Sequence, residues 1–225
     1  MKDGYHGTGP GAFTPDGCAV DLYARLPVRD EPEIIASAVP PPATLLELGA
    51  GAGRVTAALT ARGYTVTAVD ESPEMLAHIT GARTVCSSIE DLRLPDRYEV
   101  VLLSSFLVHA PDPAVRAALL DTCRRHVAPG GVVLIQREGA NWHEQVPRES
   151  RAGDGIARAL ASEDLGDGTR SVRFEYEFPD ATWTQTFRSR PLTPEQFEQA
   201  LSGAGLVLDR NLTSDGIWTC CRPVD

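Results

Sequence analysis

Three glycines, Gly49, Gly51 and Gly53, fall within five residues between an apolar run and a helical pattern. Glycine lets the backbone turn sharply and lets a ligand approach where a Cβ atom would collide. Asp70 follows seventeen residues after Gly53, at the end of the next apolar run. In neighbouring parallel strands such a turn and such a carboxylate meet at one edge of the sheet, where the carboxylate accepts hydrogen bonds from ribose hydroxyls. The spacing predicts a site for an adenosine-containing cofactor.

Two classes of adenosine cofactor use a glycine turn of this kind, and the sequence favours one of them. A dinucleotide fingerprint requires G-x-G-x-x-G/A, and its sixth position falls on Arg54 or on Thr56, depending on the starting glycine. Neither side chain is small enough for the close helix packing of that motif. A nicotinamide-dependent oxidoreductase therefore stays a disfavoured alternative.

The stretch "ELGAGAG" at residues 47–53 resembles the first motif of the class I S-adenosylmethionine-dependent methyltransferases, E/D-x-G-x-G-x-G. The motifs of the family match over residues 43–137, and the order of expected helix and strands matches over residues 192–222. The resemblance is closest to the small-molecule branch of that superfamily. It implies that S-adenosylmethionine is the cofactor, that S-adenosylhomocysteine is its product and that a small molecule is methylated. A protein that binds the cofactor without catalysis is the second alternative.

The resemblance also implies roles for residues at matching positions. The glycine turn would lie under the methionine part of the cofactor, the acidic residues after the second strand would bind the ribose, and the stretch "SSIEDL" would surround the adenine. Ser88 departs from the family, which often has an aspartate there. Two serines after the fourth strand would lie beside the sulfonium. The implied cofactor contacts are Glu47, Gly49, Ala50, Gly51, Gly53, Asp70, Glu71, Ser88, Ile89, Glu90, Ser104 and Ser105.

The histidines are candidates for a general base, because imidazole titrates near the working pH. His109 and His143 follow the fourth and fifth expected strands, at the edge where substrate would sit, and His6 lies in the N-terminal segment. A base is needed only if the acceptor keeps its proton until transfer, since the cofactor carries the activated group and the protein aligns the reactants. His78 and His126 are expected on helix surfaces. No histidine or cysteine spacing matches a metal site.

Strand and helix patterns alternate through the first two thirds of the chain, which predicts parallel strands joined by helices. Later, residues 171–178 and 182–190 alternate in polarity like an antiparallel hairpin. We therefore expect an α/β fold: a doubly wound, seven-stranded, mostly parallel sheet with an antiparallel hairpin insertion. The seven expected sheet strands cover residues 43–48, 64–69, 82–87, 98–106, 132–137, 205–211 and 216–222.

The 225 residues are expected to form a single methyltransferase domain. Residues 4–15 are expected to be a flexible arm that closes over the cofactor, and residues 139–170 to be irregular. Contacts to the acceptor are expected from Tyr5, His6, Phe106, Trp142 and His143. The expected parts are an N-terminal lid at 1–40, a cofactor-binding core at 43–137, a substrate-side insertion at 139–190 and a C-terminal helix with strands at 191–225.

The composition of the chain excludes some classes of binding partner from the expected ones. The formal net charge is −10 and no Lys/Arg-rich run follows a phosphate backbone, so nucleic acid is not an expected partner. The sequence shows no signal-peptide pattern and no apolar run of membrane-spanning length, so we expect a cytoplasmic protein with no membrane partner. Five cysteines without a CxxC pair indicate reduced thiols. The acceptor, the attacking atom and a possible homodimer stay open.

Overall fold

The computed structural model describes residues 1–224. The chain divides into two compact units. The inserted unit consists of Met1–Pro27 and Ala140–Pro191, and the core unit runs from Val28 to Gly139 and from Leu192 onward. The segment that enters the chain between the fifth and sixth core strands thus folds together with the N-terminal residues.

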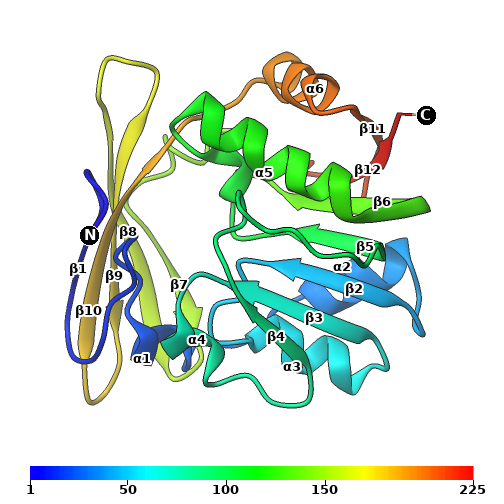
Figure 1. The fold of residues 1–225 in the computed structure, drawn as a ribbon. Coiled ribbons are helices and arrows are strands. Elements are labelled where there is room, and N and C mark those ends of the chain that lie inside the picture. The colour runs from blue at the N-terminus through cyan, green and yellow to red at the C-terminus, as the bar shows by residue number, and fades with distance from the viewer. Residues whose placement is uncertain (225) are drawn as a thin grey trace. The chain divides into compact units, whose positions relative to one another are not determined.

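The core unit contains the expected seven-stranded sheet, in the order β11-β12-β6-β5-β2-β3-β4 (Figure 1). The strands from β2 to β6 pair in parallel, whereas β12 is antiparallel to β6 and β11 is antiparallel to β12. The predicted fold class is confirmed. The strands are β2 (Thr44–Leu48), β3 (Thr65–Asp70), β4 (Arg83–Cys86), β5 (Tyr98–Leu103), β6 (Val127–Gln136), β11 (Leu206–Asn211) and β12 (Trp218–Pro223).

Helices cover both faces of this sheet, as a doubly wound fold requires. Leu119 and Phe197, from α5 and α6, pack on the face that includes Leu46 and Val101. Leu59 and other residues of α2 and α3 pack on the opposite face (Figure 1). The helices are α2 (Glu31–Ala38), α3 (Arg54–Ala61), α4 (Pro73–Leu76), α5 (Pro113–His126) and α6 (Pro194–Gly203), with a 3₁₀ turn η1 at Leu107–His109.

Two helices begin with side-chain caps that short-range sequence patterns favour. The Ser72 hydroxyl accepts a hydrogen bond from the backbone N–H of Met75, with proline at the first helical position. A complete capping box opens α6, because Thr193 and Gln196 each accept the other's backbone N–H. Such caps satisfy donors that the helix itself leaves unpaired.

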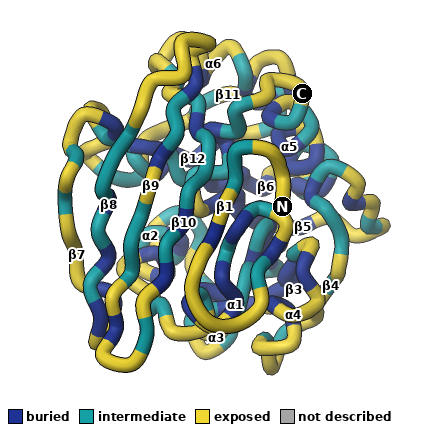
Figure 2. Tube along the Cα trace, turned by 90° about the vertical axis from the view of Figure 1, so that its left-hand side faces the viewer, coloured by how far each residue is buried: buried dark blue, intermediate teal, exposed yellow. Residues whose placement is uncertain are grey.

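The inserted unit is a five-stranded antiparallel sheet in the order β1-β10-β9-β8-β7. The predicted hairpin is confirmed as β9 and β10. Buried and partly exposed residues alternate along the first half of β8, so one face of the sheet is covered (Figure 2). The elements are β1 (His6–Thr8), α1 (Val20–Tyr23), β7 (Arg148–Ala152), β8 (Gly155–Asp164), β9 (Arg170–Glu177) and β10 (Thr182–Ser189).

Two expectations about this unit are wrong. The stretch 139–170, expected to be irregular, contains β7 and β8, and Arg158 of β8 forms ion pairs with Glu175 and Glu177 on the neighbouring strand β9. The segment 4–15 is not a loose arm, because β1 pairs with β10 and the indole N–H of Trp183 donates to the carbonyl of Pro10. Its role as a lid stays a prediction.

Within residues 1–224, no helix combines the length and the apolar character needed to cross a membrane. The same residues hold no group of three or more His, Cys, Asp or Glu side chains arranged to bind a metal. All five cysteines are free thiols.

Candidate cofactor site and active site

The glycine turn lies at the carboxyl end of β2 and opens α3. Gly49, Gly51 and Gly53 have φ values of +72°, +55° and +82°, in the left-handed region that glycine adopts without strain. The backbone N–H groups of Gly49 and Ala50 both donate to the carbonyl of Val69 at 2.9 Å. A Cβ atom on Gly53 would lie 2.5 Å from Cγ1 of Ile79, so this position has no room for a side chain.

Asp70 ends β3 and is tied to the glycine turn. Its Oδ2 accepts a hydrogen bond from the Gly51 N–H at 2.8 Å, and its Oδ1 accepts one from the Ser72 N–H at 3.0 Å. Because β2 and β3 are neighbouring parallel strands, the turn and the carboxylate lie at the same sheet edge, as predicted. Glu71 follows directly and is exposed.

Glu47 lies one residue before the end of β2 and is almost completely buried, at 2% exposure. Burial raises the pKa of Glu47 to about 7, although the Thr56 hydroxyl and the Arg54 charge act in the opposite direction. The Thr56 hydroxyl donates to Glu47 at 2.6 Å from the first turn of α3. Sequence reasoning used Thr56 only to reject a dinucleotide motif and missed this contact.

Arg54, the first residue of α3, forms an ion pair with Glu31 at the start of α2. Burial pushes the pKa of Glu31 upward, but the charge and hydrogen bond of Arg54, together with backbone hydrogen bonds from Glu31 and Arg29, act the other way, and the pKa is lowered. The glycine turn is thus surrounded by the carboxylates of Glu31, Glu47 and Asp70 and by one guanidinium. This balance of charge favours a ligand that carries a positive charge.

Other loops meet the turn from the ends of β4 and β5. A Cβ atom on Gly49 would lie 2.8 Å from Cδ1 of Leu107 and 3.8 Å from Cδ1 of Ile89. Ser88, expected at the adenine, exchanges hydrogen bonds with Asp91: its hydroxyl donates to the carboxylate and accepts from the backbone N–H. The Ser88 hydroxyl therefore serves the local turn, and contact of Ser88 and Glu90 with the cofactor stays a prediction.

The turn after β5 has an unusual backbone. Ser104 is buried, and the next two residues, Ser105 and Phe106, have φ values of +56° and +60°. Side-chain oxygen Oε1 of Gln136, the last residue of β6, accepts a hydrogen bond from the Ser105 N–H at 2.8 Å. This side chain was not expected in the site.

His109 and Glu138 form a buried pair, each side chain about 3% exposed. The backbone N–H of Glu138 donates to Nε2 of His109 at 3.0 Å, so this nitrogen is an acceptor and the proton is on Nδ1. Nδ1 lies 3.3 Å from Oε2 of Glu138 and faces the carboxylate. With both nitrogens engaged by one residue, His109 is better suited to holding its loop in place than to receiving a substrate proton.

Comparison with known proteins fits this geometry. A profile described as a methyltransferase domain matches residues 46–135. A ubiquinone biosynthesis O-methyltransferase of Xylella fastidiosa is 32% identical over 136 residues, which are 56% of this chain and 53% of that protein. Residues 46–135 are thus similar to a methyltransferase domain, within the region 43–137 where the sequence resembles the class I S-adenosylmethionine-dependent methyltransferases.

Solved structures of methyltransferases share the fold of this chain. The CcbJ methyltransferase from Streptomyces caelestis has a TM-score of 0.70 at 21% identity, covering 88% of this chain and 91% of the other. The sugar N-methyltransferase KedS8 from Streptoalloteichus has a TM-score of 0.68 at 19% identity, covering 96% and 98%. The chain spans about half the length of the Xylella relative it matches in sequence.

Four of the five residues expected to contact the acceptor belong to the inserted unit. His143 is buried, with Nδ1 2.8 Å from the Ser162 hydroxyl and its ring edge-on to Trp142. Tyr5 donates to the carbonyl of Arg188, and His6 is exposed on β1. The fifth, Phe106, lies in the core unit. Their roles stay predictions.

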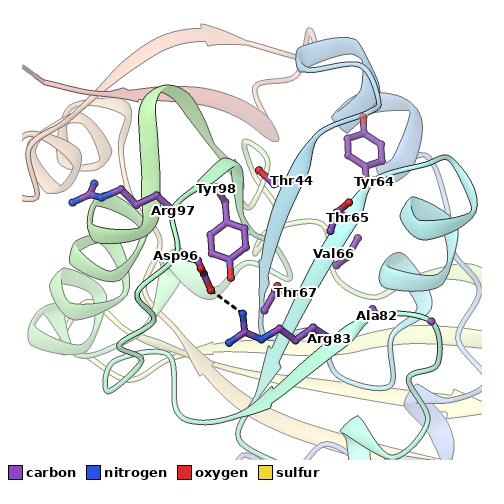
Figure 3. Close-up of a pocket in the computed structure, with 11 residues that line it drawn as sticks. Thr44, Tyr64, Thr65, Val66, Thr67, Ala82, Arg83, Asp96, Arg97 and Tyr98 are labelled. Carbon is purple, nitrogen blue, oxygen red and sulfur yellow. Dashed lines mark hydrogen bonds and ion pairs between the residues drawn. The ribbon is translucent and has the colours of Figure 1, made fainter.

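A cavity of about 640 Å³ lies elsewhere in the core unit (Figure 3). Thr44, Thr65, Arg83 and Tyr98, the first residues of β2, β3, β4 and β5, line it. It therefore lies toward the amino ends of the strands, away from the glycine turn. The hydroxyl of Tyr98 is buried there and has no hydrogen-bond partner among residues 1–224.

Proposed function

We propose that this chain transfers a methyl group from S-adenosylmethionine to a small-molecule acceptor. The observation that carries the proposal is the glycine turn held to Asp70 by the Gly51 N–H, at the carboxyl edge of a doubly wound sheet. Ligands of open α/β sheets bind outside the carboxyl ends of the strands. The carboxylates around the turn suit a cofactor with an ammonium and a sulfonium group.

The protein's residues fit this cofactor in distinct ways. Asp70 supplies an acceptor for ribose hydroxyls and holds the turn in place; Glu47 supplies a buried carboxyl group beside the turn. The cofactor supplies an electrophilic methyl group on sulfur. Bound there, it would give this methyl group to the lone pair of the acceptor and leave as S-adenosylhomocysteine, and the acceptor's proton would pass to solvent or to a base.

The acceptor class is suggested by relatives. The Xylella protein is named as an O-methyltransferase of ubiquinone biosynthesis, and KedS8 as a sugar N-methyltransferase. Both names describe small acceptors with a hydroxyl or an amine as nucleophile. We infer that this chain acts on an acceptor of that size.

The test uses S-adenosylmethionine labelled in its methyl group and a panel of phenols, catechols and aminosugars. Wild-type protein is expected to transfer label to at least one acceptor and to release S-adenosylhomocysteine in equal amount. Asp70→Ala is the matched control with weakened cofactor binding, and it should transfer less label than wild type when S-adenosylmethionine is below saturation. Binding of S-adenosylhomocysteine without transfer to any acceptor would support the cofactor-binding alternative, and binding of NADH instead would support the oxidoreductase.

The base is a separate question. His143 and His6 stay candidates, whereas both nitrogens of His109 are engaged by Glu138. A base that takes the acceptor's proton gives a rate that rises with pH through its own pKa. We expect His143→Gln to flatten that profile, and an unchanged profile would remove His143 from the mechanism.

A further inference from the structure

The turn after β5 stores backbone strain at the cofactor edge. Ser105 and Phe106 are consecutive, neither is glycine, and both have positive φ values. A left-handed conformation is unfavourable for any residue other than glycine, so two in succession persist only where the surroundings hold them. Among the described residues, Asn141 is the only other non-glycine residue with positive φ.

The end of β6 fastens this turn at two points. At the start of the turn, Gln136 accepts the Ser105 N–H. At its end, His109 accepts the Glu138 N–H through Nε2 and faces the Glu138 carboxylate through Nδ1. Gln136 ends β6 and Glu138 follows two residues later, so both lie beside the end of the neighbouring strand β5, from which the Ser105–Phe106 turn emerges.

The fastened turn also contacts the glycine turn. The side chain of Leu107, one residue beyond Phe106, occupies the space into which a Cβ atom of Gly49 would project. A change in the conformation of residues 104–109 would therefore reshape the cofactor edge directly. Interiors transmit such shifts because they are close-packed.

We propose that Gln136, His109 and Glu138 are positioning residues that hold the Ser105–Phe106 turn in its left-handed conformation against the glycine turn. None of the three needs to touch a ligand. These residues act on the cofactor edge through the turn, because the strained turn keeps its conformation only while they hold it. The binding part of the test rests on the proposed function, since it uses S-adenosylhomocysteine as the probe.

The first test measures the affinity of the full chain for S-adenosylhomocysteine by calorimetry. Gln136→Met keeps the size of the side chain but removes the acceptor, and we expect binding to weaken about tenfold. Gln136→Glu keeps an acceptor, and we expect affinity within threefold of wild type. Glu99→Met is the matched control: Glu99 accepts the Thr44 N–H at 2.8 Å at the amino end of the sheet, and its loss should leave affinity unchanged.

The second test is a double-mutant cycle on stability, which requires no ligand. In the wild-type background, Ser105→Gly relieves the strain and should raise the urea midpoint. In the Gln136→Met background the turn is free to relax, so the same substitution should raise the midpoint less. This non-additivity distinguishes a residue that holds strain from one that merely packs.

The outcomes separate this proposal from the proposed function. If wild-type protein does not bind S-adenosylhomocysteine, the proposed function fails, and the stability cycle alone decides the positioning role. If wild-type protein binds and Gln136→Met binds equally well, or if Gln136→Glu binds as poorly as Gln136→Met, the positioning role is wrong. Additive stability effects at Ser105 and Gln136 would also overturn it.

Discussion

The two ends of the core sheet are built from the same strands but differ in kind. At the carboxyl ends, Asp70 accepts a hydrogen bond from the glycine turn and Glu47 accepts one from the first turn of α3. Two consecutive residues there, Ser105 and Phe106, have a strained left-handed backbone. At the amino ends, a cavity of about 640 Å³ is bordered by the ion pair of Arg83 and Asp96, both about half exposed (Figure 3).

The two ends differ in the number of destabilising features that they contain. A buried carboxylate and a left-handed serine both lower stability, and proteins retain such features mainly at functional sites. An exposed ion pair contributes little in either direction. The carboxyl end therefore has the features of a binding site, and substitutions at matched positions of the two ends should separate binding from stability.

The largest effect is expected at the glycine turn. Gly51→Val adds strain and a side chain at the ligand's edge, and we expect affinity for S-adenosylhomocysteine to fall at least about 100-fold. Gly63→Val is the control, because Gly63 also has positive φ (+97°) but lies near the amino ends, with its nearest neighbour, Pro41, 3.9 Å from an added Cβ. Equal loss of affinity in both variants would contradict the placement of the cofactor at the carboxyl end of the sheet.

The next largest effect is expected from the buried carboxyl group of Glu47. Its pKa of about 7 lies above the unfolded value, so the folded state holds the proton more tightly and stability falls as pH rises from about 4.5 to 7. The full effect is about 3 kcal/mol. Glu47→Gln should flatten this part of the pH profile in urea unfolding and be more stable than wild type at pH 8, yet bind S-adenosylmethionine more weakly. A variant that keeps the wild-type pH profile would show that Glu47 is not the titrating group.

Asp70→Ala should weaken cofactor binding by roughly 1.5–3 kcal/mol, the usual worth of hydrogen bonds to a charged acceptor. The variant loses the ribose acceptor and also releases the Gly51 N–H. Asp96→Ala, at the other end of the sheet, removes an exposed carboxylate and should leave affinity within error. Calorimetry on both variants would contradict the assignment if Asp70→Ala bound like wild type.

The smallest effect is expected at the amino end. The Tyr98 hydroxyl is buried without a partner among residues 1–224, so Tyr98→Phe removes an unsatisfied group and should stabilise the protein by about 1 kcal/mol. Affinity for S-adenosylhomocysteine should not change. Destabilisation in urea unfolding would show that the hydroxyl is hydrogen-bonded, for example by water.

The sequence was sufficient for the features whose signal is local. The glycine turn and Asp70 were readable because only a glycine-rich loop between apolar runs gives that spacing, and the caps at Ser72 and Thr193 follow short-range rules. Strands β7 and β8 were missed because they contain many charged residues, which in a sequence are typical of a loop. In the structure such residues pair across strands, as Arg158 does with Glu177.

Contacts between distant segments were also beyond the sequence. His126, expected at a helix surface, is fully buried because its Nε2 accepts the Leu94 N–H and its Nδ1 faces the Thr122 carbonyl. The partnership of His109 with Glu138 likewise depends on how β5 and β6 align. Polar residues at the end of an apolar strand were the one available signal for Gln136 and Glu138.

The most direct test of which end binds the cofactor is amide hydrogen exchange of the full chain with and without S-adenosylhomocysteine. We predict that the ligand slows exchange at the carboxyl ends, in residues 48–53, 70–76 and 104–109, and leaves residues 64–67 and 96–98 unchanged. Protection centred on the cavity at residues 64–67 and 96–98, or no protection under saturating ligand, would contradict the account.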